Sequence, residues 1–598
     1  MNKRGFKLAA AMLACVLSVV ACGPGQRKSD KAFNGPDESK FPLTYESKDK
    51  EIKGGVYKVG VSNPNPIKGI FTPVLQNDAV DFYFSTYFDA PLFESDENFD
   101  VTDKGLAKID IDTDNKTVTV TLKDNLKWDD GQPMTIDDYI YTYEVVGNKD
   151  YTGVRYDNGM AKIVGMEDYH EGKADSIKGL EKLNDTAVKI HFEEMSPVMR
   201  KGLGGLCSNI IPKHILSKIP IKDLEKSDPV RLHPVGAGPF KVVNVVPGES
   251  IECVPNPYYY RKDEMPKVDK LIVKVVPTSS VLSSMKNGEY DQYKAVTEDI
   301  YTEYKDFDNL VTLGRPALYY QYLGFNLGTW DKQKGECVPD KNAKMYDINL
   351  RKAMAYALDM DTVTKSFYNG LRTRANGVIP PIFKDIYDPA PTYTYNPEKA
   401  KEILDKAGYK DVNGDGIRED KNGKPLEIFF GMPASGDSAE PMAQKYIQDW
   451  KAVGLKVSLS GGRLIEGNSF FDRLEANDKG IDIWLAAWGV GTAMDLNGTY
   501  SIKSQFNFSR YSTPENEELI NKVSSLEGLK DPEYRVKSIK EWHKNYMNNV
   551  LGFLPVAFKF ELTPYNKRVK FATMSIDPKV SEGKTMAVTA QQPYKSTK

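Results

Sequence analysis

Cys22 is the residue whose surroundings most clearly indicate chemistry. It follows an apolar run over residues 6–21 that ends in small residues, and Lys3 and Arg4 stand before this run. The run is shorter than the roughly 20 residues that a membrane-spanning helix needs, and the pattern is typical of a lipoprotein signal. We expect cleavage after residue 21 and a lipid such as palmitate on the Cys22 thiol, which places the protein on the extracellular face of the cell membrane. An uncleaved anchor helix is the alternative.

The other reactive side chains form no pattern of a catalytic or metal site. The histidines show no paired spacing on one helix, and the cysteines left after residue 22 show no zinc pattern. These residues are His170, His191, His214, His233, His543, Cys207, Cys253 and Cys337. No segment resembles a nucleophile elbow or a phosphate loop. We therefore expect no enzyme, cofactor or metal, and the sequence leaves open whether Cys207 and Cys253 pair.

The segment Asp411–Gly416 imitates the start of a calcium loop. It reads DVNGDG, which supplies oxygen ligands at alternate positions. A complete loop needs a bidentate carboxylate at its twelfth position, and that position is Asn422 here. A strand-like segment follows, so we interpret DVNGDG as a connection between elements, with calcium binding as the alternative.

Charge and length limit the class of protein further. Removal of residues 1–21 changes the formal net charge from −3 to −6, and charges of both signs are mixed along the chain. This balance gives no reason to expect nucleic acid as a partner. The remaining length exceeds what one hydrophobic core usually supports, so we expect two or three domains.

Elements that position such side chains can be predicted from periodicity. Between residues 50 and 260 the pattern predicts a strand at 54–60, a hairpin and helix within 106–146, and an antiparallel pair over 240–260. Thr135 is expected to cap that helix, with Asp138 three residues later. We also expect a strand at 188–192 and a short helical stretch at 212–224.

The second half alternates strands and helices, which indicates an α/β domain. Expected helices cover 349–368, 397–407 and 439–453, and Gly408 ends the second of these. Expected strands cover 319–326, 425–432, 455–462, 482–489 and 550–560. The last strand is expected to bring the chain back to its first domain.

Motifs spread over the chain resemble the peptide-binding family of extracellular solute-binding proteins, lipoproteins that supply oligopeptide ABC importers. Those motifs include KGGVYKVG at 53–60, LKWDDGQPMTIDD at 126–138, VGAGPFKV at 235–242, LRKAMAYALDMD at 350–361, NGLRTRANGVIPP at 369–381 and QDWKAVGLKVSL at 448–459. Each is weak alone, but their order and spacing match the family, and the Gram-positive oligopeptide-binding branch is the most similar.

The resemblance implies an α/β fold of the periplasmic-binding-protein-like type II (cluster C). Two lobes are joined by a hinge, and a third domain is inserted. The expected limits are 1–21 for the signal peptide, 22–50 for the anchor and tether, 51–94 with 231–310 and 551–598 for lobe I, 95–230 for the inserted domain, and 311–550 for lobe II.

The resemblance also implies a function. Relatives capture extracellular oligopeptides in an interlobe cleft and deliver them to the permease subunits of an ABC importer. The receptor is expected to act as a monomer. A buried peptide needs partners for its amides, and pairing with sheet edges supplies them without reference to side chains. Alternatives on the same fold are receptors for a nickel chelate, haem or an oligosaccharide, or for a peptide pheromone.

Site residues follow from the same resemblance. The peptide of relatives lies beside two strand ends, which here comprise Ala487, Trp488, Gly489 and Val490 and, after the tether, Ser62 and Asn63. Trp488 is a candidate lining residue, with a core tryptophan as the alternative. Many relatives pair the peptide amine with an aspartate three residues after the tryptophan, but Gly491 stands there. Asp495 is the nearest carboxylate, and a turn residue is the alternative role.

Two further sets of residues are candidates. Tyr322 and Asn326 lie on the expected strand at 319–326, one face of which is expected to line the cleft. Arg372 and Arg374 are candidates for a peptide carboxylate, with ordinary surface arginines as the alternative.

Overall fold

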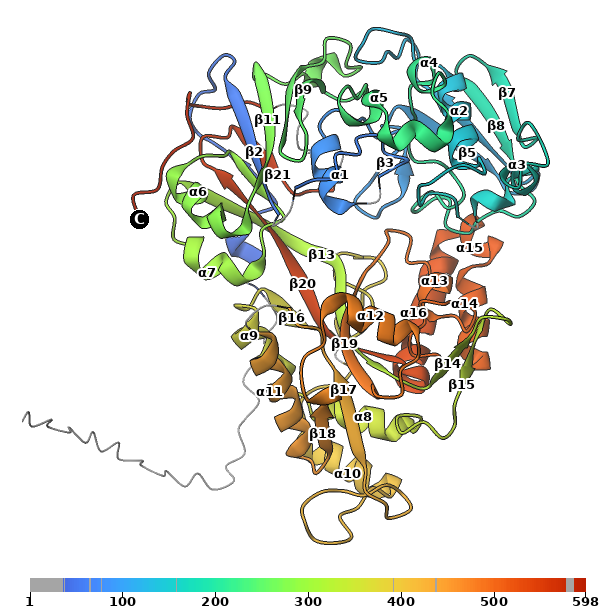
Figure 1. Ribbon diagram of the computed structural model, residues 1–598, viewed down its shortest axis with the longest axis vertical. Helices are drawn as coiled ribbons and strands as arrows, with labels where there is room; N and C mark the ends of the chain where they lie inside the picture. Colours follow the sequence, from blue (N-terminus) through green and yellow to red (C-terminus); the bar gives the residue numbers. More distant parts are fainter. Residues whose placement is uncertain are drawn as a thin grey trace, which may run out of the picture.

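The protein consists of an upper and a lower half joined by two long strands (Figure 1). The computed structural model describes residue 36 and residues 38–598, apart from 64–65, 77, 158, 391, 436–437 and 577–585. Cys22 and the expected signal peptide lie outside the described residues. Among the described residues, no helix has the length and apolar character needed to cross a bilayer.

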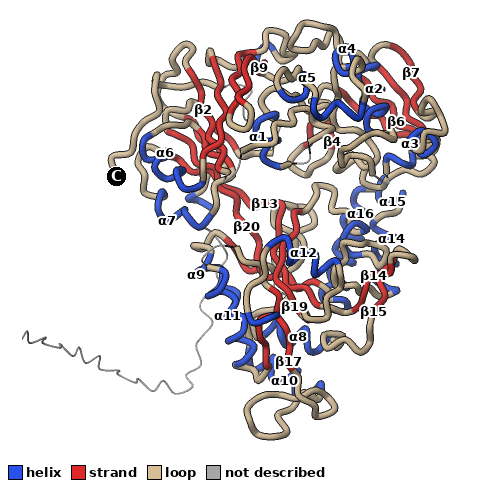
Figure 2. Tube along the Cα trace, viewed as in Figure 1, coloured by secondary structure: helices blue, strands red, loops and turns tan. Residues whose placement is uncertain are grey.

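A single mixed sheet of eleven strands runs through both halves. Its order is β18-β17-β19-β13-β20-β12-β2-β11-β10-β9, and β16 pairs with β20 beside this path. Strands β13 (Leu310–Phe325) and β20 (Phe553–Asn566) are antiparallel and much longer than the others. Leu310 lies opposite Asn566 at one end of this pair, and Gly324 lies opposite Phe553 at the other. Figure 2 shows the strands as a band that continues from the upper into the lower half.

The left part of the upper half is built around β2 (Val56–Ser62). This strand is parallel to β11 (Lys270–Val276) and β12 (Gln292–Lys294), its neighbours on either side. The predicted antiparallel pair is confirmed as β9 (Phe240–Val246) and β10 (Ser250–Pro255). One cluster of buried apolar side chains fills the space between these strands and the first helix, α1 (Ala79–Ser85).

The right part of the upper half has a core of its own. Four antiparallel strands lie in the order β5 (Ala107–Asp112), β6 (Thr117–Leu122), β8 (Ala187–His191) and β7 (Leu180–Asn184). Helix α2 (Ile136–Val146) begins at the predicted capping box, in which the Thr135 N–H donates to Asp138 Oδ2 at 2.9 Å. The indole N–H of the buried Trp128 donates to the same carboxylate oxygen at 3.4 Å, so the WDDG turn and the helix are held together.

The lower half packs helices against its part of the sheet. Its other strands are β17 (Glu427–Gly431), β18 (Lys456–Leu459), β19 (Ile483–Gly489) and β16 (Arg372–Arg374). Its longer helices are α8 (Ile348–Tyr356), α9 (Met360–Phe367), α10 (Pro397–Ala407), α11 (Ala439–Lys451), α12 (Gly467–Glu475), α14 (Pro514–Val523) and α16 (Pro532–Asn545). Helix α10 has the predicted bounds, and Gly408 ends it in the left-handed conformation with φ 93°. The largest buried apolar cluster of the described chain lies here.

Two details differ from the sequence predictions, and the pairing of Cys207 with Cys253, which the sequence left open, is answered. The helix expected over 349–368 is two helices, because Asp359 interrupts it and accepts the Thr362 N–H at 3.1 Å as the cap of α9. A hairpin of β14 (Gly328–Asp331) and β15 (Glu336–Pro339) was not predicted. Cys207 and Cys253 are free and buried, so they form no bridge.

The DVNGDG segment is a connection, as interpreted. The two oxygens of Asp411 accept the N–H groups of Gly414 and Gly416 at 2.7 and 2.9 Å. The Asp411 carboxylate therefore stabilises the turn by pairing with its backbone N–H groups. Among the described residues, no group of three or more histidine, cysteine, aspartate or glutamate side chains is arranged to hold a metal ion.

The two halves also touch away from the long strands. Lys201 Nζ lies 3.3 Å from Asp385 Oδ2, and the Arg200 Nε–H donates to the Leu529 carbonyl at 3.3 Å. Near the long strands, Glu298 of the upper half pairs with Arg372 at 2.8 Å. The upper half therefore contacts the lower one on both sides of the strands that join them.

Candidate functional site

The end of β19 reaches the point where β13 passes from one half to the other. Trp488 lies opposite Tyr320, and the Val490 N–H donates to the Leu318 carbonyl at 3.0 Å. Trp488 and Val490 are half-buried, and Gly489 is exposed. A Cβ added at Gly489 would meet no atom within 4 Å. The chain at this strand end is therefore open on the side of Gly489.

One edge of β19 has no strand beside its last residues. Phe430 and Gly431 of β17 pair with Ile483 and Trp484, where that ladder ends. Among the described strands, only β13 pairs with residues 485–489. The carbonyl and N–H groups along the other edge are thus placed to pair with an added strand.

Trp488 is held in a stack of aromatic rings. Its indole is nearly parallel to the ring of Tyr322, with an interplanar angle of 11° and centroids 6.1 Å apart. The ring of Phe508 is parallel to the indole at 1° and 5.9 Å. Aromatic rings at these separations attract each other beyond the area that they bury. The stack fixes the orientation of Trp488, whose buried indole nitrogen has no acceptor among the described residues.

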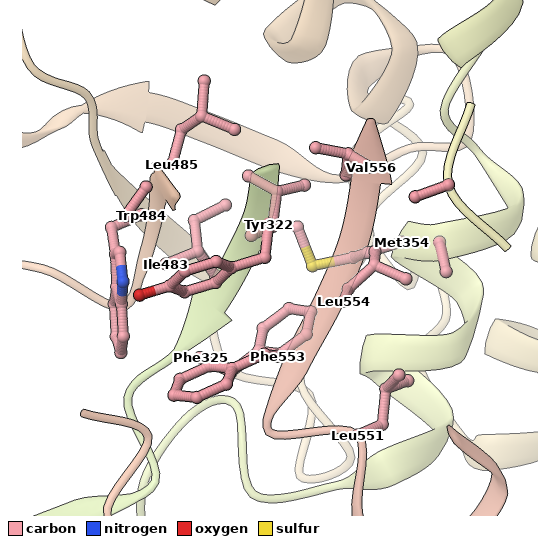
Figure 3. Close-up of a cluster of buried hydrophobic side chains, with 14 of the residues drawn as sticks. Tyr322, Phe325, Met354, Ile483, Trp484, Leu485, Leu551, Phe553, Leu554 and Val556 are labelled. Carbon is pink, nitrogen blue, oxygen red and sulfur yellow. The ribbon is translucent and has the colours of Figure 1, made fainter. Parts of the chain in front are cut away.

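Tyr322 lies beneath this tryptophan and not at the surface. It is 1% exposed, and its ring lies 4.6 Å from that of Phe553. Figure 3 shows its hydroxyl pointing toward the indole of Trp484. The neighbouring Tyr320 is equally buried and shares a hydrogen bond with the Tyr500 hydroxyl at 2.7 Å. The expected cleft-lining face of this strand thus packs into the core of the lower half.

Asn326 also has partners inside the protein. Its Nδ2 donates to the Ile481 carbonyl at 3.0 Å, and its backbone N–H donates to the Asp482 carbonyl at 2.9 Å. These bonds fasten the end of β13 to the residues that lead into β19. Ser62 and Asn63 lie in the upper half, at the carboxyl end of β2, where the Asn63 N–H donates to the Val276 carbonyl at 3.0 Å.

Between Trp488 and Asp495 the chain contacts α16 and the upper half at Ala493. The Ala493 carbonyl accepts an N–H of Arg535 at 2.5 Å, and a Cβ added at Gly202 of the upper half would lie 2.8 Å from the Ala493 Cβ. Asp495 is exposed, and one of its carboxylate oxygens accepts the Asn497 N–H at 3.0 Å. Burial lowers the pKa of Arg535, and Asp495 is among the carboxylates that oppose this shift. The carboxylate therefore closes a turn, and its negative charge favours the protonated form of the buried Arg535.

Arg372 and Arg374 lie in β16 and are both engaged. The Arg372 Nε–H donates to Glu298 at 2.8 Å, and its guanidinium lies 3.9 Å from the ring centre of Tyr368. Arg374 donates to the Tyr393 carbonyl at 3.0 Å. The Arg372–Glu298 pair therefore links the two halves, and Arg374 is held within the lower half.

Sequence reasoning missed the loop at 501–510, which packs against Trp488. Phe506 is 47% exposed, and its ring is edge-on to the indole at 6.3 Å and 86°. The alternating segment QFNFSR at 505–510 carries an apolar signal, but nothing in it indicates which strand it approaches.

Comparison with solved structures identifies the fold. Lactococcal OppA, solved with an endogenous peptide in the closed conformation, is 33% identical, with a TM-score of 0.73 over 89% of this chain and 99% of that one. AppA from Bacillus subtilis, solved with a nonapeptide, is 23% identical with a TM-score of 0.65 over 90% of this chain and all of that one. At that identity, AppA supports the fold alone. The expected fold, α/β with two lobes, is confirmed.

Sequence comparison identifies the family. The oligopeptide-binding protein OppA of Lactococcus lactis subsp. lactis is 34% identical over 592 residues, which cover 96% of each chain. The oligopeptide-binding protein AppA of Bacillus subtilis (strain 168) is 27% identical over 69% of this chain and 70% of its own. Residues 102–510 match the model for the middle part of bacterial extracellular solute-binding proteins, family 5. The chain therefore belongs to the family 5 extracellular solute-binding proteins of bacteria.

Proposed function

We propose that this protein captures oligopeptides outside the cell and delivers them to an ABC importer, without changing any covalent bond. The observation that carries the proposal is the 34% identity to an oligopeptide-binding protein across 96% of both chains. A relative of the same fold, with 33% identity, was solved with an endogenous peptide. The proposal thus rests on similarity along the whole chain. The strand edge at β19 supplies a physical explanation of how a peptide could be bound.

A peptide can be bound through its main chain at this edge. An extended segment placed beside residues 485–489 would pair its amides with those of β19, as a further strand of the sheet. Gly489 and Gly491 leave room there, because a Cβ added at either would meet nothing within 4 Å. Pairing of this kind ignores side chains, so it supports binding of many sequences.

We assign the following contacts to the peptide. The lower half contributes Ala487, Trp488, Gly489 and Val490, and the upper half contributes Ser62 and Asn63. Asp495 receives the peptide amine. Their placement favours supporting roles for Tyr322, which stacks under Trp488, and Asn326, which holds the Ile481 carbonyl. Direct contact of these two with a peptide stays a prediction.

The domain limits and the anchor belong to the same proposal. We place lobe I at 51–94, 231–310 and 551–598, the inserted domain at 95–230 and lobe II at 311–550. Three separate buried clusters of the described chain support three such units, and residues 551–558 pack in the cluster of the lower half. The pattern of residues 1–22 supports a lipid on Cys22. We propose that the protein acts as a monomer on the outer face of the membrane.

Native mass spectrometry tests the function. The body of the protein, residues 28–598, is purified from cells without added ligand and sprayed intact. A ladder of bound masses that differ by amino-acid residue masses is the expected result, and its spread gives the range of peptide lengths. A single non-peptide mass, such as haem, an oligosaccharide or a nickel chelate, would overturn the proposal.

A further inference from the structure

We propose that a cavity on the lower half binds a small organic anion, one that carries a carboxylate or phosphate group on an apolar body. The cavity lies between the C-terminal part of α16 and the loop at 387–390, and its volume is about 660 Å³. Ligand sites of proteins have volumes of this order. None of its described lining residues is among those assigned above to the peptide, so it is a second site that does not depend on the proposed peptide binding.

Two lysines of α16 give the cavity a positively charged wall. Lys540 and Lys544 both line it, and they lie one turn apart on the same face of the helix. Among the described residues, no carboxylate pairs with either ammonium group. Glu541 stands between them in the sequence but pairs with Lys522 of α14 at 2.6 Å. Like charges at this spacing repel each other, and an anion bound between the two lysines removes that repulsion.

His543 adds a hydrogen-bond donor of fixed orientation. Its Nε2 accepts the Val378 N–H at 3.2 Å, so the neutral ring carries its proton on Nδ1. Gly377 makes this approach possible, because a Cβ added there would collide with Nε2. The ring also lines the cavity, and its Nδ1–H has no acceptor among the described residues. The imidazole therefore offers an unused N–H beside the two ammonium groups.

The remaining lining residues define the rest of the ligand. Tyr387, Pro389 and the buried Met547 line the cavity with apolar surface, which suits an apolar body. Asp388 is the lining residue whose charge opposes an anion, and one of its carboxylate oxygens accepts the Ala390 N–H at 2.9 Å. Two ammonium groups outweigh this single carboxylate, so the lining has a net positive charge.

The experiment measures binding to the full mature chain by calorimetry at neutral pH. The probes are phenylpropionate, phenyl phosphate and the uncharged alcohol phenylpropanol. At least one of the two anions is expected to bind with a dissociation constant below about 1 mM, and the alcohol is expected to bind at least roughly tenfold more weakly. The anion that binds more tightly identifies carboxylate or phosphate as the preferred charged group.

Three variants locate the bound anion. Lys540→Ala combined with Lys544→Ala is expected to weaken anion binding roughly tenfold or more, because both charged donors are lost. Lys537→Ala is the matched control, since Lys537 is an exposed lysine of the same helix that does not line the cavity, and it is expected to bind as the wild type does. Asp388→Asn keeps an acceptor for the Ala390 N–H and removes the opposing charge, so it is expected to bind the anion more tightly.

Thermal unfolding verifies that each variant folds. The site is overturned if neither anion binds the wild type, if the double lysine variant binds as tightly as the wild type, or if Lys537→Ala weakens binding as much as the double variant does. Weaker binding by Asp388→Asn would also contradict it. The ladder of peptide masses proposed above is expected to be the same in all variants, so loss of the anion site and failure of the proposed function are measured separately.

Discussion

Asp291 and Arg568 form a bidentate ion pair in which both side chains are fully buried. Arg568 Nε and Nη2 lie 2.5 and 2.7 Å from the two carboxylate oxygens of Asp291. The guanidinium also donates to the carbonyls of Val56 and Ala590 at 2.7 Å each. This one side chain thus joins the start of β2 to the C-terminal segment.

Arg568→Met is expected to destabilise the protein by about 3–5 kcal/mol, because it leaves the Asp291 carboxylate buried without its cation. Urea unfolding of the variant measures this loss. Replacement of both residues by leucine removes the stranded charge and is expected to recover part of the stability. A double variant that is less stable than Arg568→Met would contradict the explanation.

His543 makes stability depend on pH. Burial lowers the pKa of His543 to about 4, and its Nε2 accepts the Val378 N–H at 3.2 Å. The unfolded chain protonates this ring near pH 6.5, so between pH 6.5 and 4 the unfolded state binds more protons. The contribution of the neutral His543 ring to the free energy of unfolding is complete above pH 6.5. It falls by about 3 kcal/mol as the pH drops to 4.

Unfolding curves at several pH values test this prediction. His543→Gln, which keeps an acceptor for the Val378 N–H, is expected to show a flatter decline than the wild type between pH 6.5 and 4. His233→Gln, at an exposed histidine, serves as the control and should leave the decline unchanged. Equal slopes for His543→Gln and the wild type would contradict the assignment.

Asp495→Asn is expected to weaken the binding of peptides with a free amine roughly tenfold, because a charge-assisted contact is lost. N-acetylated peptides should bind the variant and the wild type equally. Calorimetry with the two peptide forms measures the difference, and Glu398→Gln, at an exposed carboxylate in α10, is the control. If both peptide forms bind the variant as they bind the wild type, Asp495 serves only the turn at Asn497.

The lipid anchor is tested on the mature N-terminus. Mass spectrometry of the wild type is expected to find a chain that begins at Cys22 and carries fatty-acid mass. Cys22→Ala removes the acylated thiol and is expected to yield a chain without that mass. A wild-type chain that still begins at Met1 would instead support an uncleaved anchor helix.

Most elements could be predicted from the sequence because their signals are local. Pro397 and Gly408 mark the two ends of α10, and Thr135 with Asp138 marks the start of α2. The break at Asp359 was missed because leucine and methionine on either side continue the apolar pattern of a helix. Asp359 starts the second helix by accepting both the N–H and the hydroxyl of Thr362, and periodicity does not reveal such side-chain bonds.

The candidate site was less predictable, because its geometry depends on contacts between distant segments. Alternation on β13 indicates which residues share a face, but not whether that face meets a ligand or a core. Tyr322 meets Trp488 and Phe553, which lie more than 160 residues further along the chain. Phe506 approaches Trp488 only because Asn507 and Arg510 fold the loop back.

The continuity of β13 and β20 decides how the two halves can move. A joint made of loops would let them swing and slide, whereas two hydrogen-bonded strands permit only bending and twisting of the ribbon. Their register shifts between Pro316 and Tyr320, and again between Gln321 and Tyr322, which are the places where such a ribbon bends most easily. Any change in the angle between the halves must therefore bend or twist this ribbon, and the two register shifts are where we expect the bend to fall.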